Sequence, residues 1–357
     1  MPDRKRQLAE LREKLAESDR ALVEQLDARA ALSHELRALL EGEAPGVDVE
    51  EASWLAALVA RSSGAFPEAS LRHVLSAVRA ESRAMAQPVR VAYLGPEGGL
   101  THLTAQAQFG VGATYVESPT PADVLDEVVR TRATHAVFPY ESSTDGLIQS
   151  SITALAATEL VIVAERVAAV TSDLMSRTGN LADVEKIYAT AAGHAACERF
   201  LERELPRADV LDVRSPRFAA ELTHDDHGAA AIVPEATGRA LGLVTIRQNI
   251  GDVPDLRCRY AIASARPAPR SGRDATCLLF SVDDAPGSLF EVLRHFAERG
   301  VNMKKLQSRP ARGEGWDYVF YVEVSGHVTD RPVVTALEAV KRSTKYLRVL
   351  GSFQSMS

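Results

Sequence analysis

Leucines recur every three or four positions along residues 5–40, and charged residues fill most of the positions between them. This spacing is typical of an amphipathic helix, so we predict one long helix over 5–40. Gly and Pro residues in 41–48 interrupt the pattern, and two further helices are predicted around 49–61 and over 67–86. The leucines that carry the first pattern are Leu8, Leu11, Leu15, Leu22, Leu26 and Leu32.

From residue 88 onward, short apolar runs alternate with helical patterns. Such alternation predicts a mainly parallel α/β sheet. Two α/β series follow each other and the last apolar run returns toward the first series, so we predict two lobes with a cleft between them. The predicted strands are 89–95, 135–141, 160–170, 184–190, 208–214, 229–234 and 256–265, and the predicted helices are 101–110, 122–130, 194–205 and 216–223.

A turn-rich segment with Pro267, Pro269 and Gly272 precedes a final stretch whose patterns follow the order βαββαβ. That order is typical of a ferredoxin-like α+β fold. Changes of pattern along the chain therefore predict three domains, which cover 1–87, 88–266 and 273–357. The elements predicted in the last domain are strands 276–282, 302–309, 316–324 and 346–352 and helices 288–299 and 331–344.

Composition and charge exclude several classes of protein. The formal net charge of -7 provides no basic field for nucleic acid. No apolar run approaches the roughly 20 residues that span a bilayer, and the charged start lacks the apolar stretch of a signal peptide. The three cysteines have no short paired spacing, which argues against a disulfide framework or a zinc site. We expect a cytoplasmic protein with no metal, no cofactor, no nucleic acid and no membrane partner.

Five segments resemble motifs of two domain families. Residues 91–102 (VAYLGPEGGLTH), 138–148 (FPYESSTDGLI) and 255–262 (DLRCRYAI) resemble signatures of prephenate dehydratases. Residues 286–296 (PGSLFEVLRHF) and 302–310 (NMKKLQSRP) resemble the two motifs of the phenylalanine-binding ACT domain.

The segments ELREKL (10–15) and LDARAALSHEL (26–36) resemble the first helix of the all-helical chorismate mutases. Over nearly its whole length, the chain thus resembles the bifunctional chorismate mutase–prephenate dehydratases with a C-terminal ACT domain. This resemblance implies an all-α mutase-like domain, a two-lobed α/β dehydratase domain similar to periplasmic binding proteins, and a ferredoxin-like ACT domain.

The resemblance implies a chorismate site made of cations and hydrogen-bond donors, since the rearrangement needs only positioning and charge stabilisation. Arg12 and Arg29 match the family's two arginines, and lie about 26 Å apart on a straight helix that rises 1.5 Å per residue. One small substrate cannot touch both, and in the family an intertwined dimer brings one arginine from the partner chain. Asp48 and Ser82 also match, but the family's lysine is Leu40 here. We expect a mutase-like domain that is retained for dimerisation, with weak or absent mutase activity.

Prephenate loses carbon dioxide and hydroxide together, so a catalyst must bind carboxylates and donate a proton to the departing hydroxyl. The resemblance assigns the donor to the threonine of a Thr-Arg-Phe tripeptide, which is Cys258, Arg259 and Tyr260 here. It implies that Arg259 grips a substrate carboxylate. An adjacent cation can lower the pKa of Cys258, and a thiolate could not donate the proton. The alternative is that Cys258 is a small buried apolar residue.

Other hydroxyl residues complete the implied dehydratase site. Ser142 replaces an asparagine of the family. Of two polar segments that the family has in the second lobe, this chain retains only the hydroxyl residues Thr190 and Ser215. We expect His102 to hold backbone at the start of a helix rather than to act in the cleft. The predicted catalytic residues are Cys258, Arg259, Thr101, Ser142, Ser143 and Thr144.

The ACT motifs imply a site for L-phenylalanine, because a helix that opens at Gly287 offers backbone amides to a carboxylate. Gln307 stands where the family has glutamate, so a charge near the ammonium group is lost. The alternative is an ordinary ferredoxin-like dimerisation module. The predicted effector-binding residues are Gly287, Ser288, Leu289, Asn302, Gln307, Ser308, Arg309 and Pro310.

Three functions remain open from the sequence. The first is prephenate dehydratase activity in phenylalanine biosynthesis, inhibited by phenylalanine, with prephenate as substrate and chorismate as a second one if the mutase is active. The second is a catalytically silent paralogue that senses an aromatic amino acid or a prephenate-like acid. The third is altered chemistry on a related cyclohexadiene acid. In each case we expect a homodimer or a dimer of dimers.

Overall fold

The computed structural model describes residues 2–39, 51–310 and 318–355. These residues form two compact units: a helical unit that also includes Gln106–Thr114, and a larger α/β unit. Asp48, one of the predicted chorismate-binding residues, lies outside the described residues.

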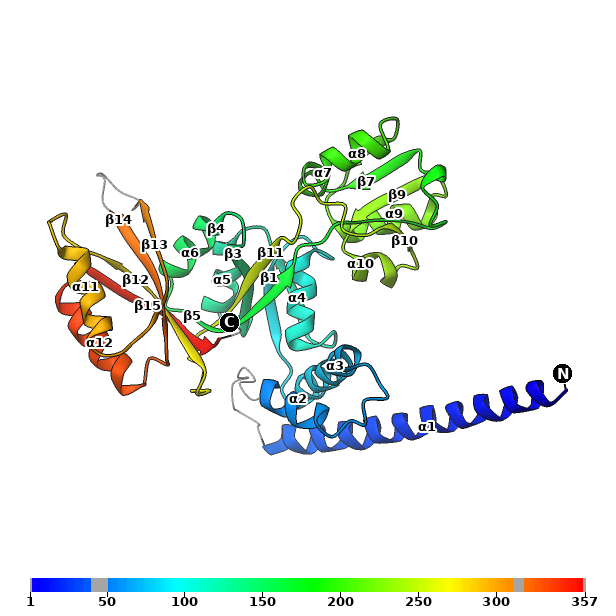
Figure 1. Cartoon of the computed structure of the whole chain (residues 1–357), viewed down its shortest axis with the longest axis horizontal. Helices are drawn as coiled ribbons and strands as arrows, with labels where there is room; N and C mark the ends of the chain where they lie inside the picture. Colours follow the sequence, from blue (N-terminus) through cyan, green and yellow to red (C-terminus); the bar gives the residue numbers. More distant parts are fainter. Residues whose placement is uncertain (1, 40–50, 311–317, 356–357) are drawn as a thin grey trace. The chain divides into compact units, whose positions relative to one another are not determined.

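The helical unit consists of α1 (Pro2–Leu39), α2 (Glu51–Val59) and α3 (Glu68–Ala86), close to the predicted ranges. In Figure 1, α2 and α3 lie against the C-terminal half of α1, and the N-terminal half extends beyond them. The predicted leucine stripe is therefore exposed in a single chain, and the Leu22 side chain is 58% exposed.

The first lobe of the α/β unit is a sheet with helices packed against it. Its parallel strands β1 and β3 neighbour each other, and β11 runs antiparallel between β3 and β5. The prediction of a mainly parallel sheet is therefore wrong. The chain leaves this lobe after β5 and returns through β11, so the returning strand enters the sheet in the opposite direction. The elements are β1 (Arg90–Leu94), α4 (Leu100–Phe109), β2 (Thr114–Ser118), α5 (Pro121–Val129), β3 (His135–Ser142), β4 (Gly146–Leu147), α6 (Gln149–Ala156), β5 (Val161–Ala169) and β11 (Arg257–Ser264).

The second lobe has a five-stranded sheet in the order β10-β6-β9-β7-β8, again with both parallel and antiparallel pairs. The helix predicted over 194–205 is two helices, α7 and α8, which meet at the buried residue Cys197. The elements are β6 (Asp173–Ser176), η1 (Leu181–Asp183), β7 (Lys186–Ala189), α7 (Ala191–Ala195), α8 (Glu198–Glu204), β8 (Asp209–Asp212), α9 (Pro216–Asp225), β9 (Ala229–Val233), α10 (Glu235–Ala240) and β10 (Val244–Arg247).

The C-terminal domain has the predicted ferredoxin-like order, and its strands are arranged β13-β14-β12-β15. Strand β15 also pairs with β5 of the first lobe at Gly351 and Ile162, so one sheet continues through both domains. A Cβ atom at Gly351 would collide with the Ile162 backbone, which explains the glycine at this crossing. The elements are β12 (Asp274–Ser281), α11 (Ser288–Ala297), β13 (Met303–Pro310), β14 (Tyr318–Ser325), α12 (Arg331–Arg342) and β15 (Tyr346–Gln354).

Both faces of the C-terminal sheet are buried, each against a different partner. On one face, Leu278 and Phe280 pack in a core with α11 and α12. On the other face, Cys277 and Leu279 join the hydrophobic core of the first lobe. Successive residues of a strand point to opposite faces, so β12, β14 and β15 each contribute to both cores.

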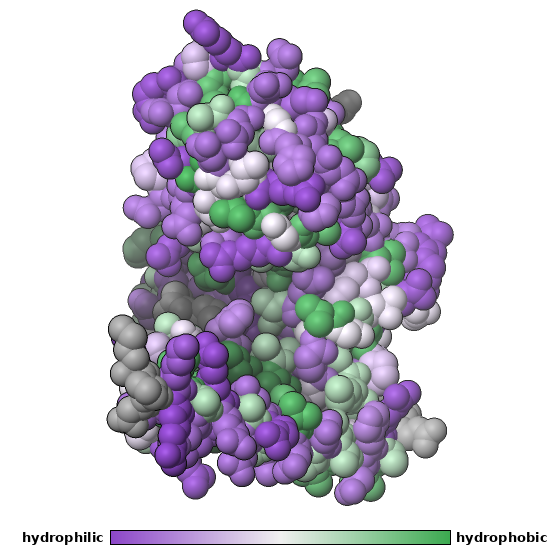
Figure 2. Space-filling view, turned by 90° about the vertical axis from the view of Figure 1, so that its right-hand side faces the viewer, coloured by the Kyte–Doolittle hydropathy of each residue, from purple (hydrophilic) through white to green (hydrophobic). Residues whose placement is uncertain are grey.

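Figure 2 shows a face on which hydrophilic residues predominate and apolar residues occur in small groups. Within the described part of the chain, no helix combines the length and the apolar character needed to cross a membrane.

Candidate functional site

The predicted catalytic residues gather at one edge of the first-lobe sheet. The parallel strands β1 and β3 end at this edge, and the antiparallel strand β11 begins there. Cys258 on β11 is paired with Ser142 on β3. Ser143 Oγ accepts a hydrogen bond from the Arg257 backbone N–H (3.0 Å), although the two residues are 114 positions apart. Thr101 is buried in the first turn of α4, which follows β1.

Hydroxyl groups cluster in the turn that follows β3. Ser142 Oγ and Thr144 Oγ1 are 2.9 Å apart, and Thr144 Oγ1 donates to the Asp145 carboxylate at 3.1 Å. The next residue, Gly146, has φ +72°, a conformation that glycine adopts readily. Sequence reasoning missed Asp145, although an acidic residue in the middle of a hydroxyl-rich turn was a visible signal.

Cys258 and Tyr260 point to the same face of β11 and are both buried. Burial raises the pKa of the Cys258 thiol to about 11, while the Tyr260 hydroxyl contributes in the opposite direction. The expectation that the adjacent cation lowers this pKa is wrong, because Arg259 points to the other face of the strand. The Cys258 thiol is therefore protonated at neutral pH and retains a proton to donate.

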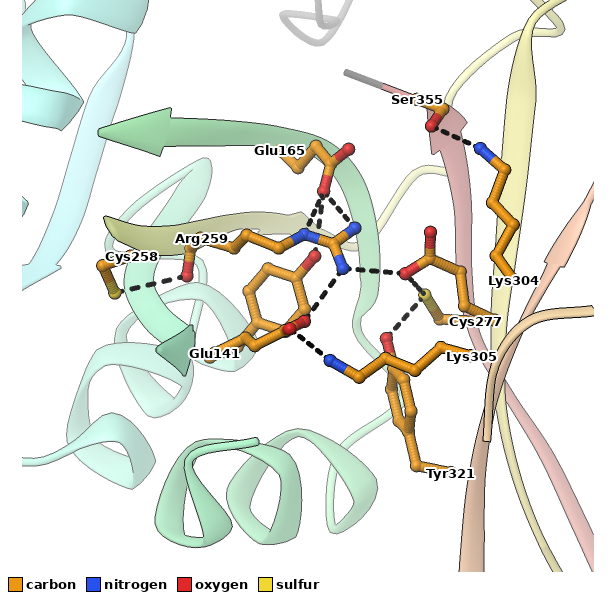
Figure 3. Close-up of polar contacts among 11 residues, drawn as sticks. Glu141, Glu165, Cys258, Arg259, Cys277, Lys304, Lys305, Tyr321 and Ser355 are labelled. Atoms are coloured by element: carbon orange, nitrogen blue, oxygen red, sulfur yellow. Dashed lines mark hydrogen bonds and ion pairs between the residues drawn. The ribbon is translucent and has the colours of Figure 1, made fainter. Parts of the chain in front are cut away.

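Arg259 is bound by three carboxylates of the chain itself. Its Nη1 donates to Glu141 and to Glu323, each at 2.9 Å, and its Nε donates to Glu165 at 2.9 Å. Lys305 pairs with the other oxygen of Glu141, as Figure 3 shows. We call these five residues the Arg259 cluster. The Glu165 and Glu323 side chains are only 1% and 3% exposed.

The electrostatics of this cluster favour a permanently charged Arg259. Burial acts to lower the pKa of Arg259, but Tyr140, Glu165 and Glu323 raise it overall. The Tyr140 hydroxyl also donates to Glu165 at 2.9 Å. The centroid of the Tyr140 ring lies 5.1 Å from the Arg259 guanidinium carbon. The binding of a substrate carboxylate by Arg259 stays a prediction. In this structure, the Arg259 guanidinium binds carboxylates of the protein instead. Sequence reasoning missed the acidic partners because they come from distant segments.

His102 holds backbone, as predicted. Its Nδ1 accepts a hydrogen bond from Gly98 N–H at 3.1 Å, and its ring stacks on Tyr93 with centroids 4.6 Å apart. Burial lowers the pKa of His102, so the ring is neutral and Nδ1 can accept. This contact fixes the turn between β1 and α4, next to Thr101.

Two hydroxyl residues of the second lobe cap helices. Thr190 accepts from Gly193 N–H at 3.1 Å at the start of α7, and Ser215 accepts from Phe218 N–H at 3.1 Å at the start of α9. Ser215 also lines a cavity of about 410 Å³ between the lobes. A second cavity, of about 250 Å³, is lined by Glu141, Ser142, Ser143, Glu165, Val167, Arg257 and Arg259.

The structure divides the predicted effector-binding residues between two faces of the C-terminal sheet. Gly287, with φ +87°, caps α11 and is followed by Ser288 and Leu289. Arg309 lies on the opposite face, where its Nη1 donates to Thr153 of α6 at 3.0 Å, and Gln307 points the same way.

The other predicted effector-binding residues belong to or adjoin β13. Ser308 alternates with Gln307 and Arg309 and faces the helices, and Asn302 is exposed just before the strand. Pro310 is the last residue of β13.

In the helical unit, the structure brings two of the predicted chorismate-binding residues together. Arg29 Nε donates to Ser82 Oγ at 2.8 Å. The Arg29 and Arg79 guanidinium groups lie 5.8 Å and 4.6 Å from the Trp54 ring centroid. Sequence reasoning missed Trp54 and Arg79. Arg12 is exposed on the N-terminal half of α1, so it does not join Arg29 within one chain.

Comparison with known proteins identifies the domains and the family of this chain. The family model for prephenate dehydratase matches residues 91–268, and the ACT domain model matches residues 278–342. A bifunctional chorismate mutase/prephenate dehydratase from Aquifex aeolicus is 33% identical over 290 residues, which cover 81% of this chain and 80% of that protein. This chain belongs to the bifunctional chorismate mutase/prephenate dehydratase family.

Two further relatives support the assignment of the separate domains. The bifunctional enzyme from Neisseria gonorrhoeae is 29% identical and covers 94% of this chain and 93% of its own length, so the similarity extends into the helical unit. The crystal structure of prephenate dehydratase from Arthrobacter aurescens in complex with L-Phe has a TM-score of 0.63 and 31% identity, and covers 75% of this chain and 90% of that chain. The two lobes are thus a prephenate dehydratase domain, and the C-terminal domain is an ACT domain.

Proposed function

We propose that this chain converts prephenate to phenylpyruvate at the edge of the first lobe where β3 ends and β11 begins. The observation that carries the proposal is the pairing of Cys258 with Ser142, which joins two distant family segments into one site. The buried Cys258 thiol keeps its proton at neutral pH, as a general acid must.

In the proposed reaction, the bond between the ring and its carboxylate breaks and carbon dioxide leaves. The electron pair enters the ring and expels the hydroxide, which takes the proton from Cys258 and departs as water. The thiolate then recovers a proton from solvent. A thiol is a weaker hydrogen-bond donor than a hydroxyl, so we expect slower turnover than a threonine would give. The hydroxyls of Thr101, Ser142, Ser143 and Thr144 are proposed to orient the substrate.

The helical domain is proposed to dimerise and to keep at most weak chorismate mutase activity. The contact between Arg29 and Ser82 supplies one half of the proposed chorismate site. Arg12 from a second copy would supply the other half, because α1 places it too far from Arg29 in the same chain. The match of Asp48 to the family stays a prediction.

The ACT domain is proposed to bind L-phenylalanine and to inhibit the dehydratase. The relative from Arthrobacter aurescens was crystallised with L-Phe, and the ACT domain model matches residues 278–342 of the present chain. The opening of α11 at Gly287 offers backbone amides to the carboxylate of an amino acid. The cytoplasmic location and the domain boundaries 1–87, 88–266 and 273–357 stay predictions.

The direct test is incubation of the purified protein with prephenate and, separately, with chorismate at neutral pH, with the products separated by chromatography. We expect phenylpyruvate from prephenate, formed faster than in buffer, and little prephenate from chorismate. Prephenate that persists as long as in buffer would contradict the proposal and favour a sensor. A non-aromatic product would instead establish altered chemistry on a cyclohexadiene acid.

A further inference from the structure

The Arg259 cluster is a buried charged junction between two domains. Glu141, Glu165 and Arg259 belong to the dehydratase domain, whereas Lys305 and Glu323 belong to the ACT domain. Each cation bonds at least one carboxylate of the other domain: Lys305 pairs with Glu141, and Arg259 pairs with Glu323. Three carboxylates and two cations are thus held together with little access to water, where charge pairs are strong and unpaired charges are costly.

One face of β13 follows the dehydratase domain along its length. Lys305 contacts Glu141 on β3, and two positions later Gln307 lies against Gly146 on β4. A Cβ atom at Gly146 would lie 3.2 Å from Gln307 Oε1, so the missing side chain permits this approach. Arg309, two positions further, contacts α6. Lys305 and Gln307 therefore contact the segment 138–148 that carries the proposed catalytic hydroxyls, and Arg309 contacts the helix that follows it.

The cluster is also adjacent in the chain to the proposed catalytic residues. Glu141 directly precedes Ser142, and Arg259 directly follows Cys258. The register of β11 against β3 shifts between Arg259 and Tyr260, so the regular ladder is interrupted at this point. The ladder of β11 with β5 stays regular here, so the ion pairs add contacts on the β3 side, where the ladder is irregular.

We propose that Lys305 and Glu323 of the ACT domain are positioning residues for the dehydratase site. They hold Glu141 and Arg259 from outside the dehydratase domain and thereby place Ser142 and Cys258 relative to each other. Their effect on turnover rests on the proposed dehydratase function, whereas their effect on the order of residues 138–148 does not.

The chain offers a matched pair of lysines for the test. Lys304 and Lys305 are neighbours on β13, but Lys304 bonds Ser355 within the ACT domain at 2.9 Å and Lys305 bonds Glu141, as Figure 3 shows. The variants Lys305→Met and Glu323→Gln break the junction, Lys304→Met is the control, and Lys305→Arg keeps the charge. All are made in the full-length chain.

Two measurements are made on each variant. Hydrogen exchange, read by mass spectrometry, follows the amides of 138–148, and initial rates with prephenate give kcat and KM. We expect faster exchange in this segment for Lys305→Met and Glu323→Gln, with the wild-type pattern in Lys304→Met. We also expect kcat to fall about tenfold while KM changes less than about threefold, because a displaced donor affects the transition state more than binding. Lys305→Arg should recover most of kcat.

The two kinds of failure are distinguishable. If Lys305→Met and Lys304→Met show the same exchange over 138–148, the positioning role is contradicted, whatever the rates. If the wild-type protein does not convert prephenate, the proposed function fails, and the exchange comparison still decides whether the junction orders the segment. Faster exchange without a fall in kcat would overturn the link to the active site.

Discussion

The Arg259 cluster and helix α1 show opposite ways of completing a site. In the cluster, every one of the five charged side chains is paired within one chain, and the group is largely buried. On α1, leucines at helical spacing remain exposed, and the proposed chorismate-binding residues Arg12 and Arg29 are separated along the helix. The Arg259 cluster is complete within a single chain, whereas the described residues of one chain do not bring Arg12 and Arg29 together.

The largest effect is expected from removal of the central cation of the cluster. Arg259→Met leaves three carboxylates with Lys305 as the remaining cation of the cluster, and breaking a buried pair typically costs about 3–5 kcal/mol. We expect a loss of that size in the free energy of unfolding measured with urea. Arg257→Met on the same strand is the control, since Arg257 is exposed and should change stability by less than about 0.5 kcal/mol. Equal losses in the two variants would mean that the cluster does not hold the junction.

A smaller effect, on association rather than folding, is expected on α1. If a second copy covers Leu22, then Leu22→Glu removes about 1.5–3 kcal/mol of apolar burial and weakens the dimer roughly 10- to 150-fold. Sedimentation at several protein concentrations measures this dissociation constant. Arg20→Gln changes the net charge by the same amount on the other side of the helix and should leave the dimer intact. A monomeric wild-type protein would remove the basis for a mutase site shared between copies.

The smallest effect is the pH dependence of stability that His102 confers on the dehydratase domain. The pKa of His102 is lower in the folded protein than the value of about 6.5 expected in the unfolded chain. As the pH falls below about 6.5, the unfolded state takes up the proton first, so stability decreases by at most about 1.4 kcal/mol per pH unit. Glutamine can also accept from Gly98, so His102→Gln should flatten this part of the pH profile in thermal denaturation. Parallel profiles of the variant and the wild type would show that His102 does not contribute.

Patterns of local spacing predicted most elements, because an amphipathic or fully apolar stretch reveals its structure by itself. The helices of the N-terminal unit and all six elements of the ACT domain were predicted within a few residues. Strand β6 and helix α6 were missed, since they are short and lack a clear period. The break at Cys197 was missed because the helical pattern continues across it.

Local sequence patterns could not predict the contacts that complete the site, because these contacts join distant segments. Arg259 was singled out from its tripeptide, but its partners Glu165 and Glu323 are 94 and 64 positions away. The pairing of β15 with β5 joins the ACT sheet to the first-lobe sheet, one strand away from β11, and no periodicity along the chain encodes that pairing. Burial raises the pKa of the Cys258 thiol, and Arg259, on the other face of the strand, does not offset it.

The proposed role of the Cys258 thiol as proton donor is tested by comparing Cys258→Ala, Cys258→Thr and the wild type in the conversion of prephenate to phenylpyruvate. General acid catalysis contributes roughly 10²- to 10⁴-fold, so Cys258→Ala should lower kcat by at least about 100-fold. Cys258→Thr should raise kcat above that of the wild type, because a hydroxyl is the stronger hydrogen-bond donor. An alanine variant as active as the wild type would contradict the account and place the donor elsewhere in the cleft.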